Sequence, residues 1–429
     1  MTFSKKRKAV PVRAGLAIAG LIAGTLSLLS LSTQAAEGIT ATEKQRVRTL
    51  EELRSGIKQR QNQTTSDELS QEATPIDVPS EDDANVRPRV GTTNPMEVQP
   101  TRPSMPDWGP TIDPQMLAVI EQLTAYEAPP YPQLTPAQAR EAPTATSAVN
   151  GILGKTGTPP TTPAVDIEHR LIPGPDGQDI LVRTYTPTRG NEPFPVIVYY
   201  HGGGWVVADL DTYESSAKAI ATSTNAIVVS VAYRQAPEHK FPAAHEDAFA
   251  AYKWATENAA DISGDPNRIA LAGESAGGNL AIAVALMAKE RGIRLPAHIL
   301  SIYPIADGDT ESASYDQYAN ALPLNRALMN WFFGLYLNEP SEAESPLISL
   351  TSADLSGLPP TTIINAEIDP LRTEGENLAA RMEEASVDVV QMTYPGVTHE
   401  FFGMGAILEQ AMAAQEMAAE RLGAAFGVE

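Results

Sequence analysis

The chain has 429 residues, no cysteine and a formal net charge of −22 at pH 7. Because one α/β domain can exceed about 250 residues, this length accommodates one large domain with additional segments. The absence of cysteine excludes disulfides, thiolate metal sites and a cysteine nucleophile. The acidic charge argues against nucleic acid or an anionic lipid surface as a partner.

Residues 1–36 have the pattern of an export signal or an N-terminal anchor. Basic residues between positions 5 and 13 precede an uncharged stretch, residues 14–36, that is rich in Leu, Ala, Ile and Gly. The small residues Thr33 and Ala35 suit a signal-peptidase site. The alternative is a retained membrane anchor, since the uncharged stretch is nearly long enough to span a bilayer. Either way we expect an exported protein, periplasmic or secreted, that contacts a membrane only through this segment.

Residues 37–110 are predicted to be a disordered or linker segment. Residues 64–110 are rich in Pro, Thr, Asp, Glu and Asn and nearly free of large apolar side chains, so they cannot build a core. Residues 37–63 carry some apolar residues at helical spacing, but too few to fold alone.

Residues 111–165 are predicted to form a helical segment. Met116 and Ile120 lie on one face of a helix for which Asp113 and Pro114 are a good N-cap and first residue.

Short apolar runs alternate with helical stretches from residue 166 to residue 429. Such alternation predicts an α/β fold with a mostly parallel central sheet, flanked by helices on both faces, whose chemistry lies at the carboxyl ends of the strands. The expected strands fall within residues 195–204, 226–234, 268–275, 298–307, 361–370 and 389–401, and the expected helices cover residues 215–224, 244–259, 276–291 and 376–385.

A Gly-Glu-Ser-Ala-Gly sequence makes Ser275 the candidate nucleophile. It follows a strand-like run and opens a helix, which is the strand–turn–helix context that a nucleophile elbow requires. Gly273 and Gly277 allow a tight turn without Cβ clashes, and the N–H groups at the start of the following helix point toward the site.

A serine nucleophile needs a base and an orienting acid, which follow it along the chain in the order acid, then histidine. His399 lies after a strand-like run and leaves room for an acid-bearing strand, whereas His298 is only a helix away from the serine. Asp369, directly after the run 361–368, is the best-placed acid, and Glu367 is the second choice. A carboxylate there would hold the imidazole in the right tautomer and stabilise the imidazolium.

The sequence His201-Gly202-Gly203-Gly204-Trp205 follows an earlier strand-like run. Three glycines cost conformational entropy, so a bare backbone must be needed there. A phosphate cradle fits poorly, because the Lys and Ser/Thr of a P-loop are missing. Backbone N–H groups that bind a developing oxyanion fit better, since removing one such donor costs on the order of 10²–10³ in rate.

Five stretches together resemble the hormone-sensitive-lipase family of α/β-hydrolases. They are YYHGGGWVVADLDTY, VVSVAYRQAPEHKFPAAHEDAFAAYKW, RIALAGESAGGNLA, EIDPLRTEG and GVTHEFFGM, and the resemblance extends from about residue 113 to the end of the chain. It implies Ser275 as nucleophile, Asp369 as orienting acid and His399 as base. It also implies an oxyanion hole made by the backbone of Gly202, Gly203, Gly204 and Ala276. His201 would brace this loop, and His239, His245 and the Tyr233-Arg234 pair would be structural.

The resemblance further implies a helical cap, made from residues 111–165 and an insertion at about residues 310–345. Trp331 and Phe332 in the insertion, with Trp205 and Tyr213 beside the glycine loop, are the predicted substrate-binding residues. The alternative is that about half of the bulky side chains in the insertion, which are Trp331, Phe332, Phe333, Leu335 and Tyr336, belong to the core.

These features predict a serine carboxylesterase for short- to medium-chain acyl esters that uses an acyl-enzyme, needs no cofactor or metal, and has a small-molecule ester as its partner. The sequences HEDAF and HEFFG lack the second histidine of a zinc-binding H-E-x-x-H motif. A deacetylase or an amidase could use the same machinery. A non-catalytic binding protein of the same fold, as among gibberellin receptors, is disfavoured because all three triad positions are filled.

Overall fold

The computed structural model describes residues 95–102, 104–157 and 164–427. The predicted leader and most of the predicted linker lie outside these residues. The described part of that linker packs against the folded domain: Met96 N–H donates to the carbonyl of Ala406 at 3.1 Å, and Thr101 N–H donates to the Glu121 carboxylate at 2.5 Å. Within the described ranges, no helix combines the length and the apolar character that a membrane crossing needs.

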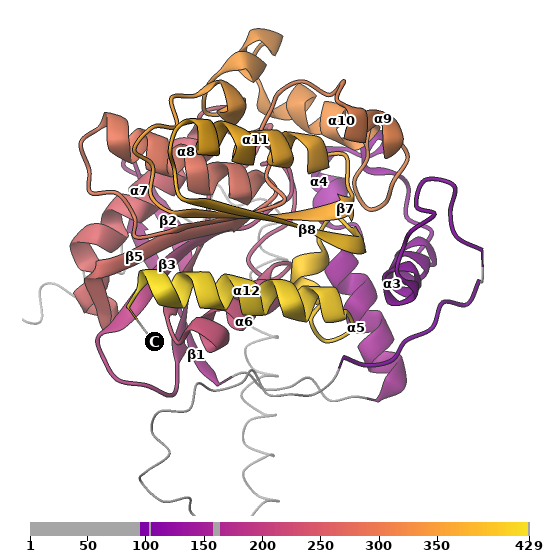
Figure 1. Ribbon diagram of the computed structural model, residues 1–429, viewed down its shortest axis with the longest axis horizontal. Coiled ribbons are helices and arrows are strands. Elements are labelled where there is room, and N and C mark those ends of the chain that lie inside the picture. Colours follow the sequence, from indigo (N-terminus) through magenta and orange to yellow (C-terminus); the bar gives the residue numbers. More distant parts are fainter. Residues whose placement is uncertain (1–94, 103, 158–163, 428–429) are drawn as a thin grey trace, which may run out of the picture. The chain divides into compact units, whose positions relative to one another are not determined.

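An eight-stranded sheet forms the centre of the domain, in the order β1-β2-β4-β3-β5-β6-β7-β8 (Figure 1). β1 pairs antiparallel with β2, and β2 with β4, whereas all later neighbours are parallel. The predicted α/β class with a mostly parallel sheet is therefore confirmed. The strands are β1 (Val165–Pro173), β2 (Asp179–Pro187), β3 (Phe194–Tyr200), β4 (Ile227–Ala232), β5 (Gly264–Glu274), β6 (Ile299–Ile302), β7 (Thr361–Ile368) and β8 (Val389–Thr398).

Helices cover both faces of the sheet (Figure 1). α7 (Ala243–Asn258), α8 (Ala276–Glu290) and α11 (Arg372–Glu384) lie on one face, and α6 (Glu214–Thr224) and α12 (Glu409–Ala425) lie on the other. α12 was not predicted, because its buried face consists largely of alanine and gives only a weak apolar periodicity. Short 3₁₀ turns complete the connections: η3 (Tyr131–Gln133), η4 (Ala259–Ile262), η5 (Pro340–Glu344), η6 (Leu350–Ser352) and η7 (Phe401–Met404).

Strand side chains alternate between two core layers. Along β3, Val196, Val198 and Tyr200 join the core under α7 and α8, while Ile197 and Tyr199 join the core on the α6 and α12 side. This period of two is the signature of a strand that is buried on both faces.

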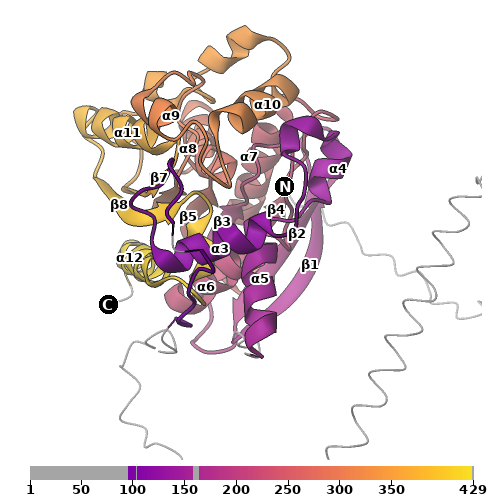
Figure 2. The same cartoon turned by 90° about the vertical axis from the view of Figure 1, so that its right-hand side faces the viewer.

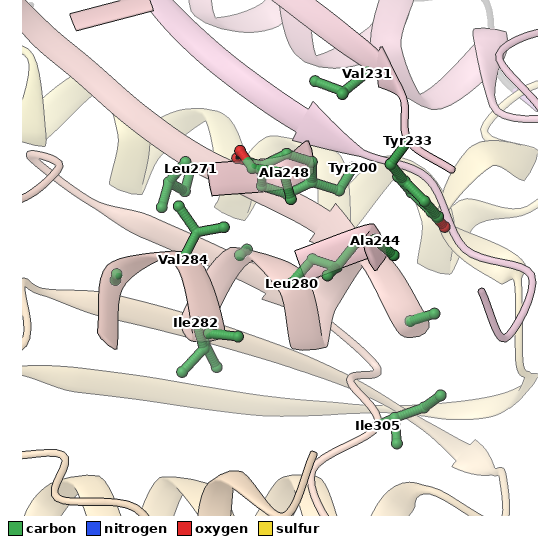
Figure 3. Close-up of a cluster of buried hydrophobic side chains, with 14 of the residues drawn as sticks. Tyr200, Val231, Tyr233, Ala244, Ala248, Leu271, Leu280, Ile282, Val284 and Ile305 are labelled. Atoms are coloured by element: carbon green, nitrogen blue, oxygen red, sulfur yellow. Dashed lines mark hydrogen bonds between the residues drawn. The ribbon is translucent and has the colours of Figure 1, made fainter. Parts of the chain in front are cut away.

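The helix that follows the elbow is one of the most buried elements. In Figure 3, Leu280 and Val284 of α8 point toward Tyr200 and Leu271, and Ile282 points away from them. All three helix residues are fully buried, and burying each such side chain contributes about 1.5–3 kcal/mol. The start of α8 is therefore held firmly against the carboxyl ends of β3 and β5.

The helices outside the sheet layers come from two segments of the chain. The first contains α3 (Pro114–Thr124), α4 (Pro136–Arg140) and α5 (Ala145–Thr156), and the second contains α9 (Ala313–Gln317) and α10 (Arg326–Tyr336). α3 begins at the predicted place, with the Asp113 side chain accepting from the N–H of Gln115 at 2.8 Å, and it runs beside α5 (Figure 2). The two segments meet where the rings of Tyr131 and Trp331 lie 6.4 Å apart.

Candidate active site

Ser275 lies at a tight turn between β5 and α8, as a nucleophile elbow requires. Its backbone has φ 57° and ψ −118°, a region that a residue with a side chain adopts only when the surroundings enforce it. The two glycines explain the turn: a Cβ on Gly273 would overlap the Gly277 carbonyl, and a Cβ on Gly277 would overlap the Tyr200 carbonyl. The Ser275 N–H donates to the Ile302 carbonyl at 2.9 Å, which ties the turn to β6.

His399 and Asp369 converge on this serine from two other strand ends. His399 follows β8, and its Nε2 lies 2.9 Å from the Ser275 Oγ. Its Nδ1 donates to the Asp369 Oδ2 at 2.7 Å, and Asp369 follows β7 and is fully buried. The Leu371 N–H donates to the other Asp369 oxygen at 2.9 Å and fixes the carboxylate. The three predicted residues thus form one continuous hydrogen-bonded chain.

The pKa of His399 is set by burial and by the carboxylates around it. Burial is the largest single influence and lowers the pKa, but the charge and hydrogen bond of Asp369, together with the charges of Glu400 and Glu274, outweigh it. The pKa of His399 therefore lies above its ordinary value of 6.5. This environment favours the imidazolium that a general base becomes when it takes a proton.

Glu367, the second choice for the acid, is bound by groups other than the imidazole. Its carboxylate accepts from the Thr111 hydroxyl at 2.9 Å and from the Gly396 N–H at 2.7 Å. It therefore ties the segment before α3 to β8, and the geometry favours Asp369 as the partner of His399.

The glycine loop follows β3 and lies against the elbow. Gly203 and Gly204 have φ of +97° and +57°, and the Gly203 carbonyl accepts from the N–H groups of Val206 and Val207. In the described part of the chain, the N–H groups of Gly203 and Gly204 donate to no protein acceptor. Ala276, as the first residue of α8, also has an N–H without an intrahelical partner. Three free donors thus remain available near Ser275.

Comparison with known proteins agrees with the fold and with the arrangement of Ser275, His399 and Asp369. A family model described as the alpha/beta hydrolase fold matches residues 197–403. The carboxylesterase NlhH of Mycobacterium tuberculosis is 40% identical over 260 residues, which cover 59% of this chain and 81% of that protein. The chain belongs to the hormone-sensitive-lipase family of α/β-hydrolases.

Other relatives of this hydrolase also carry the names of ester-cleaving enzymes. The ethyl acetate hydrolase of Pseudomonas putida is 34% identical over 251 residues, covering 58% of this chain and 79% of that protein. The solved structure of an esterase from Pyrobaculum calidifontis superposes with a TM-score of 0.66 at 37% identity, covering 74% of this chain and all of that one.

His201 of the hydrolase braces the glycine loop. Its Nδ1–H donates to the Gly202 carbonyl at 2.8 Å, and its ring stacks on Tyr233 at 4.4 Å with an angle of 16°. Burial lowers the pKa of His201 to about 4, so this ring is neutral near pH 7 and holds the loop without a charge. His245 is likewise buried, with its Nδ1 2.7 Å from the Tyr336 hydroxyl.

Of the two predicted substrate-binding residues in the insertion, Phe332 lies over the glycine loop and Trp331 lies beside Phe332. A Cβ on Gly204 would overlap the Phe332 ring, so Phe332 of α10 covers this glycine directly. Trp331 is half-buried and lies between Phe332, at 5.4 Å between ring centres, and Tyr131. Both side chains are thus placed where the two helical segments meet, and Phe332 contacts the glycine loop.

Trp205 requires a correction, because its ring lies in the core. It is fully buried and stacks on Tyr336 of α10 at 4.5 Å with an angle of 14°. The backbone of Trp205 has φ 59°, which turns the side chain toward α10 and leaves it no surface to contact a substrate. Tyr213 is also buried, and it lines a cavity of about 100 Å³ that Ser275, His399 and Asp369 do not line. Its hydroxyl lies over Gly202 and 3.3 Å from the Glu400 carboxylate.

A buried carboxylate that the sequence motifs do not single out lies beside the nucleophile. Glu274, the residue before Ser275, is 1% exposed and accepts hydrogen bonds from the hydroxyls of Tyr199 and Tyr303. Burial raises the pKa of Glu274, although hydrogen bonds from Ser216 and the two tyrosines oppose this shift. The sequence feature that indicates this buried carboxylate is an acidic residue at the end of an otherwise apolar strand run.

Within the described ranges, no group of three or more His, Asp or Glu side chains is arranged to hold a metal ion.

Proposed function

We propose that the protein is a serine carboxylesterase that cleaves small carboxylic esters through an acyl-enzyme. The observation that carries this proposal is the hydrogen-bonded chain from Ser275 through His399 to Asp369, with distances of 2.9 Å and 2.7 Å. The names of the relatives, which include a carboxylesterase and an ethyl acetate hydrolase, support it.

The first half of the reaction forms the acyl-enzyme. The Ser275 Oγ attacks the ester carbonyl carbon while its proton passes to Nε2 of His399, and Asp369 stabilises the imidazolium. The carbonyl oxygen becomes an oxyanion, which the N–H groups of Gly203, Gly204 and Ala276 stabilise. When the tetrahedral intermediate collapses, the C–O bond to the alcohol breaks, and the imidazolium gives its proton to the departing alkoxide oxygen.

The second half returns the enzyme to its starting state. A water molecule gives a proton to Nε2 of His399 as its oxygen attacks the acyl carbon, and the same N–H groups stabilise the second oxyanion. The bond between the acyl carbon and the Ser275 Oγ then breaks, the serine regains its proton from the imidazolium, and the carboxylic acid leaves. No cofactor takes part in either half.

We propose short- to medium-chain acyl groups as the substrates. Phe332 places aromatic surface over the glycine loop, where the acyl carbonyl would be held, and Trp331 lies beside Phe332. Aromatic side chains beside the glycine loop suit a short alkyl chain.

The decisive experiment compares wild-type protein with the Ser275→Ala variant on p-nitrophenyl acetate, butyrate, hexanoate and decanoate. We expect turnover by the wild type, with an optimum below decanoate, and at least a 10³-fold loss in the variant, on the order of known nucleophile deletions. Circular dichroism should show the same fold in both. Undiminished turnover by the folded variant would refute the proposal. A fluorophosphonate should label Ser275 in the wild type alone.

We also propose that the protein is exported, on the basis of the basic start and the uncharged stretch up to residue 36. The mass of the N-terminal peptide from cell fractions tests this. A new N-terminus close to Ala35 in the exported fraction supports cleavage, and an intact leader in the membrane fraction supports a retained anchor. Intact protein confined to the cytoplasm contradicts the proposal.

A further inference from the structure

A carboxylate is buried between hydroxyls from two neighbouring strands, directly before the nucleophile. Glu274 ends β5, Tyr199 lies on the adjacent β3, and Tyr303 follows β6 on the other side. The Tyr199 hydroxyl donates to Oε1 of Glu274 at 2.5 Å, and the Tyr303 hydroxyl donates to Oε2. All three side chains are at most 1% exposed. Each carboxylate oxygen of Glu274 thus accepts a hydrogen bond from one of the two tyrosines.

Of these two tyrosines, Tyr303 lies beside the catalytic base. The centre of the Tyr303 ring lies 4.6 Å from that of the His399 imidazole, at an angle of 52°. Phe401 lies 5.9 Å from the same tyrosine ring. The Tyr303 backbone has φ 35°, a region that an aromatic residue adopts only when the surroundings enforce it.

We infer that Glu274 is a positioning residue, which acts through Tyr303 to fix the orientation of the His399 ring. The inference rests on the proposed function, because His399 acts there as the base. Glu274 itself is buried and takes part in no proton transfer of the reaction.

The hydrogen bonds of His399 alone leave one rotation free. Its two nitrogens bond to Asp369 and to Ser275, and a ring held at two points can still tilt about the line that joins them. A tyrosine ring packed beside the imidazole opposes that tilt, because the imidazole would have to push Tyr303 aside. The bond from Tyr303 to Glu274 in turn keeps the tyrosine from moving.

The test uses two matched variants, Tyr303→Phe and Tyr199→Phe. Each removes one hydroxyl from a different oxygen of the same carboxylate and leaves an aromatic ring in place. Kinetics on p-nitrophenyl butyrate and the NMR signal of the proton between His399 Nδ1 and Asp369 are measured for both. The NMR signal reports the order of the imidazole and needs no turnover.

We expect Tyr303→Phe to lower kcat by roughly tenfold or more while KM stays within about twofold, because a misplaced base slows chemistry rather than binding. The His399 proton signal should broaden in this variant. Tyr199→Phe should keep kcat within about twofold and the signal sharp. Equal effects of the two variants on kcat and on the signal would overturn the inference and leave the network a purely structural one.

Glu274→Gln provides a second test if Tyr303→Phe folds poorly. It keeps the volume but replaces the acceptor of the Tyr303 hydroxyl by a donor or a neutral oxygen, so we expect the same loss of kcat and the same broadened signal. Wild-type kcat in the folded Glu274→Gln protein would overturn the inference. If the wild type hydrolyses no ester, the proposed function fails, and the NMR comparison of the variants still decides this inference.

Discussion

Glu367 and Asp369 are two residues apart at the end of β7, yet their carboxylates make unrelated contacts. Asp369 accepts a hydrogen bond from the Nδ1–H of His399. Glu367 instead accepts hydrogen bonds from the Thr111 hydroxyl and the Gly396 N–H. The pairing of β7 with β8 is irregular between Ala366 and Ile368, so the simple alternation of a strand does not apply there. One carboxylate therefore belongs to the catalytic chain and the other to the attachment of the N-terminal segment.

This division predicts opposite effects of two similar substitutions. Asp369→Asn should lower kcat by about 10⁴-fold, because an amide favours the wrong imidazole tautomer, and should leave the fold intact. Glu367→Gln should keep kcat within a few-fold and lower the free energy of unfolding by about 1–3 kcal/mol, since it weakens two hydrogen bonds. Ester kinetics and urea unfolding check both variants. A larger kcat loss in Glu367→Gln would reverse the assignment of the acid.

The pH dependence of activity should report His399. Only the neutral imidazole accepts the serine proton, so kcat/KM must fall as the pH drops through the pKa of His399, which is raised above 6.5 mainly by Asp369. Glu400 also raises this pKa, so Glu400→Gln should move the acid limb of the profile to lower pH. The control is Asp354→Asn, which removes an exposed carboxylate paired with Lys289 at the far end of α8. A limb that stays in place in Glu400→Gln, or moves equally in the control, contradicts this prediction.

The convergence of the site was predictable, because Ser275, Asp369 and His399 each follow a strand-like run. Carboxyl ends of parallel strands meet at one edge of a sheet, so motifs far apart in the sequence come together there. The choice between Asp369 and Glu367 was harder, since it depends on where β7 loses its regular pairing. That break is a tertiary feature of the β7–β8 contact.

The surroundings of the site were less predictable. Tyr199 is one apolar residue among several in its strand run, and nothing in the sequence connects it with Glu274. Trp205 was misplaced because a positive φ sends its ring into the core, and a non-glycine residue gives no sequence signal for that conformation. Side-chain networks thus need the folded arrangement of several strands, whereas the motifs need only the order of elements.

The position of Phe332 predicts an effect on acyl-chain selectivity. Its ring covers Gly204, so Phe332→Leu should open space above the glycine loop and raise kcat/KM for hexanoate relative to acetate by roughly tenfold. The matched control is Phe333→Leu, since Phe333 lies 6.3 Å from the buried Trp205 ring instead. A chain-length series of p-nitrophenyl esters measures both ratios. Equal ratios in the two variants would exclude Phe332 from the acyl pocket.

The pair of Arg234 and Asp247 should stabilise the fold without affecting the chemistry. Asp247 of α7 is fully buried, and the Arg234 guanidinium bonds both of its oxygens at 2.8 Å. Arg234→Gln leaves this carboxylate buried without its cation, so the free energy of unfolding should fall by about 3–5 kcal/mol.

The control for this substitution is Arg381→Gln, which breaks the exposed pair with Glu384 and should cost less than about 1 kcal/mol. Urea unfolding of both variants gives the two free energies, and kcat should remain near the wild-type value wherever the protein is folded. Equal destabilisation by the two substitutions would show that burial of Asp247 does not set the strength of its ion pair. A large kcat loss in the folded Arg234→Gln protein would instead show that this arginine also supports the glycine loop. The two are connected because Ala236, two residues after Arg234, donates its N–H to the carbonyl of Trp205, the residue after Gly204, at 2.9 Å.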